Sequence, residues 1–195
     1  MKGILIYLVR HGITAANKRS IYIGWADEVL DEEGISQVRA LGASLKGEGI
    51  SAVYSSPVKR ALQTSEILEE YLSAPIVIEK GLGEIRFGKW EGLSASEIKK
   101  RYPDEYQLWK TRPADLVDPG RESLPTFRRR CIDSIWKIAN LHQGTKVLAV
   151  THLANIRAVI LYFKNQDLNL YPTIKIQNAS YIRLQYDGIG FKVLE

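Results

Sequence analysis

The stretch Ile4-Leu5-Ile6-Tyr7-Leu8-Val9-Arg10-His11-Gly12 decides the fold. Its uninterrupted apolar run is typical of a strand buried on both faces of a sheet, as in parallel sheets that are covered by helices. Two more runs of the same kind lie at Ile50–Ser55 and Lys146–Thr151. The sequence therefore predicts at least three strands of the fully buried type.

Amphipathic helical patterns lie between and after these runs. They cover residues 35–45, 58–72, 124–141 and 156–163. Ser55-Ser56-Pro57 offers a capping serine followed by proline, which predicts that a helix opens directly after Ile50–Ser55. Strands that alternate with helices predict an α/β fold, with three α/β/α layers around a mostly parallel central sheet.

The remaining segments predict less regular structure. Residues 174–177, 180–186 and 191–194 are expected to form short strands, with Asp187-Gly188 as the turn of a closing hairpin. Residues 88–123 are polar and broken by prolines, so we expect short helices and loops there, over one face of the sheet. No repeat or linker divides the 195 residues, and we predict one domain over 1–195.

Composition and charge limit the class of protein. The chain is 45% hydrophobic and 25% charged, which is ordinary for a globular domain. The first apolar run ends at Arg10, far below the roughly 18 residues that span a bilayer. Cys131 is the single cysteine, so no internal disulfide can form, and a reduced thiol fits an intracellular setting. These features predict a soluble, cytoplasmic protein with no membrane partner.

The charge balance favours an anionic partner. Lys and Arg number 27 against 22 Asp and Glu, giving a net charge of +5. The basic residues are spread along the chain without a long run, which argues against nucleic acid. A small phosphorylated molecule is the expected partner.

Basic side chains follow each of the three apolar runs. Arg10 and His11 follow the first, His152 follows Lys146–Thr151, and Arg60 lies one turn into the helix after Ile50–Ser55. Sites in open α/β sheets form beyond the carboxyl ends of the strands. Two histidines and two arginines are therefore expected at one rim of the sheet.

Three interpretations of this set are open. A metal site could use His11, His152 and Glu84, but two guanidinium groups would repel a cation and no supporting carboxylates are evident. Ordinary buried histidines would explain either imidazole alone. An oxyanion site explains the whole set, because arginine forks and a helix N-terminus both favour phosphoryl oxygens. The pattern favours the oxyanion site.

The nucleophile for such a site is expected to be a histidine. Cys131 has Lys137, not arginine, six residues on, and lies on a helical pattern as a core residue. Ser55 and Ser56 have no neighbouring base in sequence. A neutral imidazole needs no activation, and His11 lies between Arg10 and a glycine that allows close approach. We predict His11 as the nucleophile.

Four ordered motifs span nearly the whole chain. They are Arg10–Asn17, Ser55–Thr64, Leu82–Gly92 and Val150-Thr151-His152, followed by Asn178-Ala179-Ser180 near the end. Together they resemble the histidine phosphatase superfamily, which includes the cofactor-dependent phosphoglycerate mutases. The resemblance implies a phosphoglycerate mutase-like fold and hydrolysis of phosphate monoesters through a phosphohistidine, without metal or cofactor.

The resemblance also implies a role for each motif residue. His11 would attack phosphorus while Arg10, Arg60 and a protonated His152 hold the phosphoryl oxygens. Glu84 would donate a proton to the leaving alcohol, with its pKa raised by burial against residues such as Phe87 and Trp90. The substrate contacts implied are Asn17 as a neutral phosphate ligand, with Thr14, Ile23, Gly24, Phe87 and Leu153.

The chain departs from the family pattern at two places. Leu153-Ala154 replaces two glycines after His152, which predicts a bulkier pocket floor. Pro119-Gly120-Arg121-Glu122-Ser123 replaces a Pro-Gly-Gly-Glu-Ser loop, so Arg121 is either a solvated loop residue or meets an anionic part of the substrate. Residues 88–123 are expected to cover the substrate.

Phosphatase and mutase remain alternatives at this point. Ile23–Asp27 resembles the mutase version, whereas Ile85–Gly92 is closer to the phosphatase branch, and the chain lacks the long insertion and arginine pair of mutases. We predict a metal-independent histidine phosphatase of the acid type, with a mutase using 2,3-bisphosphoglycerate as the alternative. A binding module without catalysis would not need Glu84. A homodimer is expected because it is common among relatives.

Overall fold

The fold is known from a computed structural model that describes residues 3–194. The strands are β1 (Ile4–Arg10), β2 (Ile50–Ser55), β3 (Ile76–Ile78), β4 (Lys146–Thr151), β5 (Tyr181–Tyr186) and β6 (Phe191–Leu194). The helices are α1 (Ala15–Lys18), α2 (Glu32–Leu45), α3 (Lys59–Leu72), α4 (Ala95–Arg101), α5 (Pro103–Thr111), α6 (Leu124–Leu141) and α7 (Leu153–Phe163). Short 3₁₀ turns lie at Lys80–Leu82, Gly88–Trp90, Pro113–Asp115 and Leu168–Thr173.

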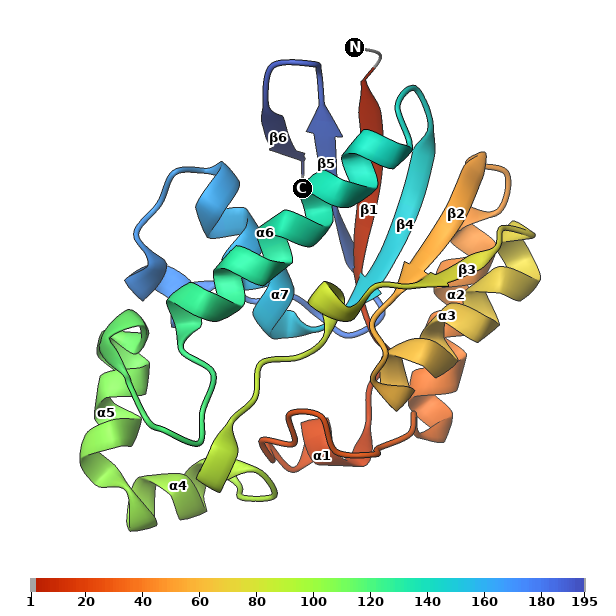
Figure 1. Cartoon of the computed structure of the whole chain (residues 1–195). Helices are drawn as coiled ribbons and strands as arrows, with labels where there is room; N and C mark the ends of the chain where they lie inside the picture. Colours follow the sequence, from red (N-terminus) through yellow and green to blue (C-terminus); the bar gives the residue numbers. More distant parts are fainter. Residues whose placement is uncertain (1–2, 195) are drawn as a thin grey trace.

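The strands form one mixed sheet in the order β3-β2-β4-β1-β5-β6 (Figure 1). β1, β2, β3 and β4 all run parallel to one another, while β5 pairs antiparallel with β1, and β5 and β6 form an antiparallel hairpin at this edge. Arg10 lies opposite Thr151 in the register of β1 and β4, and Ser55 lies opposite Val150. The mostly parallel α/β sheet is confirmed, and its three central strands end together.

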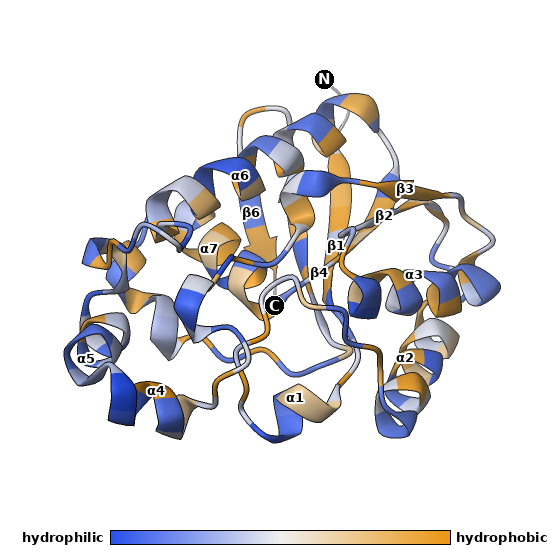
Figure 2. Ribbon diagram, turned by 60° about the horizontal axis from the view of Figure 1, so that its bottom comes forward, coloured by the Kyte–Doolittle hydropathy of each residue, from blue (hydrophilic) through white to orange (hydrophobic). Residues whose placement is uncertain are grey.

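Helices cover both faces of the sheet (Figures 1 and 2). On β1, Ile6 and Leu8 pack into a cluster with α6 and α7. Tyr7 and Val9 alternate with them and pack into a second cluster with α2 and α3. Both faces of the strand are thus buried, which is why its sequence is apolar throughout rather than alternating. The three-layer prediction is confirmed.

Some local predictions were wrong. α3 begins at Lys59 with Val58 at the cap and no capping side chain, because the Ser56 hydroxyl accepts from the Val58 amide, before the first helical turn, and contacts His152. Residues 174–177 form no strand, since carbonyls of this segment accept from arginine side chains instead. β3 was missed because it is a short edge strand with Ile78 48% exposed. The closing hairpin and α6 agree with the prediction.

The segment 88–123 folds into α4, α5 and connecting loops, as expected, but it does not lie on a face of the sheet. In Figure 1, α4 and α5 lie beyond the carboxyl ends of the strands. Gly88 has a positive φ of 59°, and a Cβ there would approach the Gly120 carbonyl oxygen at 2.5 Å. The loop before α6 is therefore held against the segment that follows Phe87.

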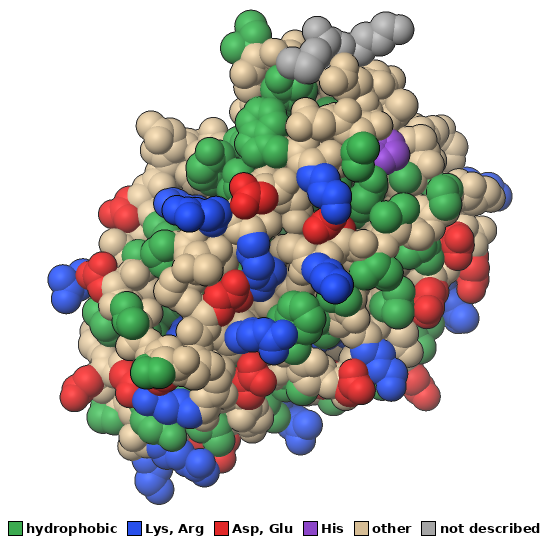
Figure 3. All heavy atoms as spheres, in the orientation of Figure 1, with side chains coloured by type: hydrophobic (Ala, Val, Ile, Leu, Met, Phe, Trp, Pro, Cys, Tyr) green, Lys and Arg blue, Asp and Glu red, His purple; other side chains and the backbone are tan. Residues whose placement is uncertain are grey.

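The surface carries side chains of both charges, as the composition of the chain predicts. On the face in Figure 3, Lys and Arg side chains are interspersed with acidic ones. Cys131 is buried among core residues of α6, as expected. Within residues 3–194, no helix has both the length and the apolar character needed to cross a bilayer.

Close packing around Gly12 gives a first testable prediction. A Cβ at this position would lie 2.7 Å from the Gly34 carbonyl oxygen and 2.8 Å from Val38 Cγ2, both on α2. Overpacking of this kind costs about 1–3 kcal/mol. We expect Gly12→Ala to lower the free energy of unfolding by that amount in urea titrations. Gly190→Ala is the control, because a Cβ there meets open space; equal midpoints for the two variants would contradict the packing.

Candidate active site

A cavity of about 520 Å³ opens at the carboxyl edge of the sheet. Most of the predicted site residues line it, and they come from β1, α1, α3, α7 and the loops between them: Arg10, His11, Asn17, Ile23, Gly24, Arg60, Glu84, Phe87 and Leu153. His152 lies directly beneath, in contact with Arg60. The fold thus brings together side chains that are far apart in the sequence.

His11 is buried with one ring nitrogen fixed. Its Nδ1 lies 2.7 Å from the Gly12 carbonyl oxygen, which can only accept, so Nδ1 carries the proton. Nε2 accepts a hydrogen bond from Arg60 Nε at 3.2 Å and therefore has its lone pair free of a proton. Burial, Arg60 and Arg10 hold the pKa of His11 well below its ordinary value. The imidazole is neutral at physiological pH, as a nucleophile requires.

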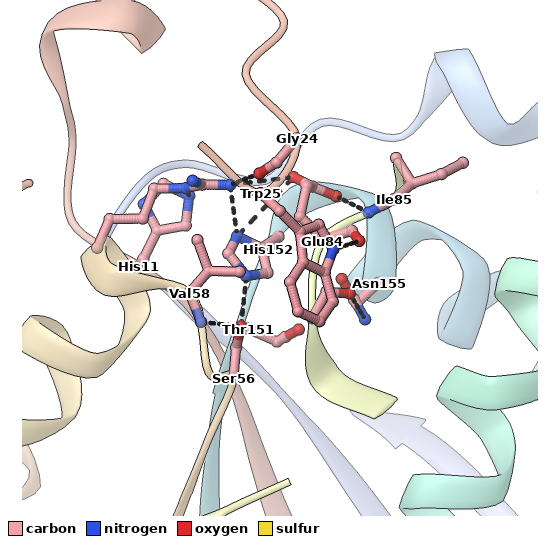
Figure 4. Close-up of polar contacts among 12 residues, drawn as sticks. His11, Gly24, Trp25, Ser56, Val58, Glu84, Ile85, Thr151, His152 and Asn155 are labelled. Atoms are coloured by element: carbon pink, nitrogen blue, oxygen red, sulfur yellow. Dashed lines mark hydrogen bonds and ion pairs between the residues drawn. The ribbon is translucent and has the colours of Figure 1, made fainter. Parts of the chain in front are cut away.

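His152 is neutral in the environment that the protein supplies. Its Nδ1 accepts from Arg60 Nη2 at 3.1 Å, and its Nε2 donates to Ser56 Oγ at 2.8 Å (Figure 4). Burial, followed by the charge of Arg60, lowers the pKa of His152 well below its usual range. The prediction of a protonated His152 is wrong for these surroundings, because the nearby arginines oppose a further positive charge.

In the folded chain Ser56 contacts a possible base, His152, which lies far from it in the sequence. The contact with His152 raises the possibility of a serine nucleophile. However, Ser56 is fully buried and is not among the residues that line the cavity, and its Oγ also accepts from the Val58 amide at 3.2 Å. The hydroxyl therefore fixes the His152 ring, and of the two candidate nucleophiles His11 is the one that lines the cavity.

Two arginines leave buried donors without partners. Arg60 is 1% exposed, and its Nη2 donates to the Gly24 carbonyl at 2.9 Å while Nη1 has no partner. Arg10 Nη1 donates to the Ile176 carbonyl at 2.6 Å, and its Nε has no partner. Burial lowers the pKa of Arg10 to about 10, so it is still charged at neutral pH. Unsatisfied guanidinium donors beside His11 form an oxyanion site.

Glu84 faces both His152 and Arg60. Its Oε2 lies 3.8 Å from His152 Nδ1 and 3.9 Å from Arg60 Nη2, while Oε1 accepts from the Ile85 amide at 2.9 Å. Burial raises the pKa of Glu84 in spite of the opposing charges of Arg60 and Arg10. The raised pKa is as expected, and it keeps a proton on this carboxyl at higher pH than on an exposed glutamate.

The backbone of Glu84 is clamped by Arg130 on α6, a residue that the motifs did not indicate. Arg130 Nη2 donates to the Glu84 carbonyl at 2.8 Å, and Nη1 donates to the carbonyls of Gly81 and Gly83. Glu122 accepts from Arg130 Nε at 2.7 Å and holds the guanidinium from the other side. This clamp fixes the loop that carries Glu84.

The clamp predicts a specific defect in Arg130→Met. For the phosphatase that the motifs imply, loss of its hydrogen bonds will leave Glu84 less well placed. The pre-steady-state phosphoryl-transfer step should then slow about tenfold more for alkyl phosphates than for p-nitrophenyl phosphate, whose leaving group needs no proton. Arg130→Lys should restore part of the rate, and the neighbouring exposed Arg129→Gln is the control. An equal fall with both esters would show that Arg130 does not act through Glu84.

Of the two polar substrate contacts predicted near α1, the structure supports one and not the other. Asn17 lines the cavity, and its Oδ1 accepts from Asn178 Nδ2 at 3.0 Å, which leaves its amide nitrogen for a ligand. Thr14 does not line the cavity. Its hydroxyl caps α1 and donates to Glu28 at 3.0 Å, so the predicted substrate contact by the Thr14 side chain is not supported.

Several cavity residues were not predicted. Ile21, Tyr22, Ala95, Trp109, Arg157, Tyr171 and Asn178 complete much of the wall. Leu153 and Ala154 also line it, in agreement with a bulkier floor.

The prediction that Arg121 is solvated is wrong. Its guanidinium carbon lies 4.2 Å from the centre of the Trp109 ring and 4.5 Å from that of the Trp90 ring. Within residues 3–194, no three His, Cys, Asp or Glu side chains gather in a way that could hold a metal ion.

Fold and site together define an α/β protein of the phosphoglycerate mutase-like class, with two histidines and two arginines at the strand ends. The sequence pattern of the histidine phosphatase superfamily (branch 1) matches residues 6–195. The chain belongs to this superfamily.

Relatives include both phosphatases and mutases. Phosphoserine phosphatase 1 of Hydrogenobacter thermophilus is 29% identical over 91% of this chain and 84% of its own. A 2,3-bisphosphoglycerate-dependent phosphoglycerate mutase of Parvibaculum lavamentivorans is 29% identical over 95% and 92%. The structure of YhfR from Bacillus stearothermophilus is 29% identical, with a TM-score of 0.93 over 97% of this chain and 95% of that one.

Proposed function

We propose that the protein is a phosphatase that hydrolyses phosphate monoesters through a phosphohistidine on His11. The observation that carries this proposal is the unprotonated Nε2 of a buried imidazole beside partnerless donors of Arg10 and Arg60. These donors match the oxygens of a phosphoryl group, on which charge is concentrated during transfer. Both phosphatases and mutases among the relatives act on such groups.

The first step transfers the phosphoryl group to the protein. The Nε2 lone pair forms a bond to phosphorus while the bond from phosphorus to the ester oxygen breaks. The alcohol oxygen takes the proton that Glu84 has kept because of its raised pKa. As phosphorus approaches, Arg60 Nε is expected to turn from Nε2 toward a phosphoryl oxygen. His152, fixed by Ser56, keeps accepting from Arg60 Nη2 and so holds that guanidinium in place.

The second step releases phosphate. Glu84, now a carboxylate, accepts a proton from a water molecule that attacks phosphorus on the side the alcohol left. The bond between phosphorus and His11 Nε2 breaks, and inorganic phosphate departs. Glu84 recovers the proton that it needs for the next cycle. The protein's own residues account for every proton in this sequence, so neither metal nor cofactor is part of the proposal.

A phosphoglycerate mutase is the second candidate. The mutase relative of comparable identity favours it, as does the presence of Ile23 and Gly24 in the cavity wall, in a segment that resembles mutases. Mutase activity would require 2,3-bisphosphoglycerate and the return of the phosphoryl group to a second hydroxyl. The phosphatase is preferred because Ile85–Gly92 resembles the phosphatase branch.

The test compares hydrolysis with interconversion. Phosphate release from several monoesters is measured beside interconversion of 2- and 3-phosphoglycerate, with and without 2,3-bisphosphoglycerate and after dialysis against a chelator. We expect phosphate release to dominate and to survive the chelator. Interconversion that is faster than hydrolysis would replace the proposal by the mutase.

The proposal also covers the location of the enzyme, the size of its substrate and its oligomeric state. We infer a cytoplasmic, acid-type phosphatase acting on a small phosphorylated substrate, with residues 88–123 covering that substrate, since Ala95 and Trp109 line the cavity. A homodimer is proposed as well, and light scattering of the purified chain tests it directly. A monomeric mass across the working concentration range would remove the dimer.

A further inference from the structure

A third arginine, Arg157 on α7, borders the same cavity. Its Nε donates to the Ile174 carbonyl at 2.7 Å, and its guanidinium carbon lies 5.3 Å from the centre of the Tyr171 ring. Within residues 3–194 it forms no ion pair, and its terminal nitrogens donate to no acceptor. The charge of Arg157 also acts on Arg10, whose pKa it helps to lower. Arg157 is thus a cation close to the phosphoryl site without a counter-charge.

The charges in the cavity wall do not balance. Among the lining residues, Arg10, Arg60 and Arg157 face the single carboxyl of Glu84, which cannot balance three positive charges. A phosphoryl group brings a charge of about −1.5 to −2 at neutral pH, which matches Arg10 and Arg60. Arg157 then remains without a counter-charge, and its half-buried guanidinium is available to a second anionic group of the substrate.

A fourth arginine strengthens the positive charge on this side of the cavity. Arg121 packs over the rings of Phe87, Trp90 and Trp109, and both of its terminal nitrogens are buried without partners. Phe87 and Trp109 line the cavity, so Arg121 lies behind its aromatic wall. Arg121 and Arg157 both act on the pKa of Tyr22 and Tyr171, two more wall residues, which places both cations near the same part of the wall.

The cavity is large enough to hold the alcohol part of a phosphate monoester as well as its phosphoryl group. A cavity of about 520 Å³ holds far more than a phosphoryl group, and pockets of this size bury complete small ligands. Apolar side chains such as Ile21, Ala95 and Leu153 line the wall and can pack against a short carbon chain. The wall therefore combines the arginines of the phosphoryl site, apolar side chains and a further cation.

We propose that Arg157, supported by Arg121, forms a second anion subsite, and that the preferred substrates are phosphomonoesters whose alcohol carries another anionic group, a carboxylate or a second phosphate. The inference rests on the proposed function, because it assigns the substrate class of the same site. A guanidinium paired with an anion in a partly desolvated wall gives a strong charge-assisted hydrogen bond.

The experiment uses two matched pairs of esters. 3-Phosphoglycerate and glycerol 3-phosphate differ in a carboxylate, and fructose 1,6-bisphosphate and fructose 6-phosphate differ in a phosphate. For each pair the ratio of kcat/KM values is measured in wild type, Arg157→Gln, Arg157→Lys, Arg121→Met and the control Arg129→Gln, which is exposed on the outer side of α6. p-Nitrophenyl phosphate serves as a general phosphatase substrate.

We expect wild type to favour the more anionic ester in at least one pair, and the favoured pair identifies the anion. Arg157→Gln should reduce that ratio about 10- to 100-fold, Arg157→Lys less, and Arg121→Met by a smaller factor, while Arg129→Gln keeps it. Equal loss with both members of a pair would mean that Arg157 only holds Ile174, and would overturn the subsite.

A second result would also overturn the subsite: wild type that hydrolyses p-nitrophenyl phosphate but shows no preference in either pair. That outcome leaves the phosphatase itself intact. Wild type that releases no phosphate from any of the five esters would instead remove the proposed function, and the subsite with it. The two failures are therefore distinguishable.

Discussion

His11→Asn will lower kcat for phosphate monoesters by about 10⁴-fold or more, the scale expected when a nucleophile is removed. The amide nitrogen of asparagine can occupy the place of His11 Nδ1 and keep a hydrogen bond to the Gly12 carbonyl. What the variant lacks is Nε2, the atom that faces Arg60 and the cavity. Steady-state phosphate release measures the effect, with thermal unfolding to show that the fold is kept.

Two further variants separate His11 from the other nucleophiles. Ser56→Ala removes the hydroxyl that contacts His152, and Cys131→Ala removes a thiol that is buried in the core. Both should keep a readily measured rate, because neither side chain lines the cavity. If Ser56→Ala or Cys131→Ala is as inactive as His11→Asn is expected to be while folded, the assignment of the nucleophile is wrong.

Glu84→Gln will show a defect that depends on the leaving group. The glutamine keeps the size of the side chain but cannot donate a proton to the alcohol, so alkyl phosphates should lose about 10²- to 10⁴-fold in the phosphoryl-transfer step. p-Nitrophenolate leaves without a proton, and its pre-steady-state burst should be reduced far less. A rapid-mixing comparison of the two esters checks this; equal losses would mean that Glu84 does not protonate the leaving group.

The pH dependence of the same step follows from the raised pKa of Glu84. Transfer from an alkyl phosphate needs the protonated carboxyl, so its rate should fall as pH rises through this pKa, above the ordinary value of 4.5. The lowered pKa of His11 keeps the nucleophile unprotonated well into the acid range. The alkaline fall should be absent in Glu84→Gln, and its persistence there would assign it to another group.

The fold was largely predictable because burial on both sheet faces leaves a strong signal. β1, β2 and β4 each have a mainly apolar, buried centre, and α6 has a serine cap, proline in its first turn and a regular apolar stripe. The predicted start of α3 was too early because the Ser56 hydroxyl accepts from the Val58 amide and contacts His152, and caps no amide of the first helical turn. β3 was too short and too exposed to stand out.

The phosphoryl side of the site was predictable for a topological reason. Strands that run parallel end at the same edge, so His11, Arg60 and His152 had to meet once β1, β2 and β4 were recognised. The charge state of His152 was not predictable in the same way. It depends on the distance to Arg60 and on complete burial, and neither is encoded in local sequence.

The alcohol side of the site could not be derived. Trp109, Arg157 and Tyr171 come from α5, α7 and a 3₁₀ turn near the C-terminus, and each looks like an ordinary amphipathic position in its own segment. Arg130 gives no local signal either, since its partners lie about 50 residues earlier along the chain. Such residues become visible only through long-range packing.

The covalent intermediate is the most direct test of the account. Wild-type protein is mixed with a ³²P-labelled monoester, quenched within the first turnover, digested and analysed by tandem mass spectrometry. We predict one phosphorylated site, at His11, with the label stable in base and lost in acid. A label on a serine or the cysteine, or full activity without any labelled protein, would contradict phosphoryl transfer through His11.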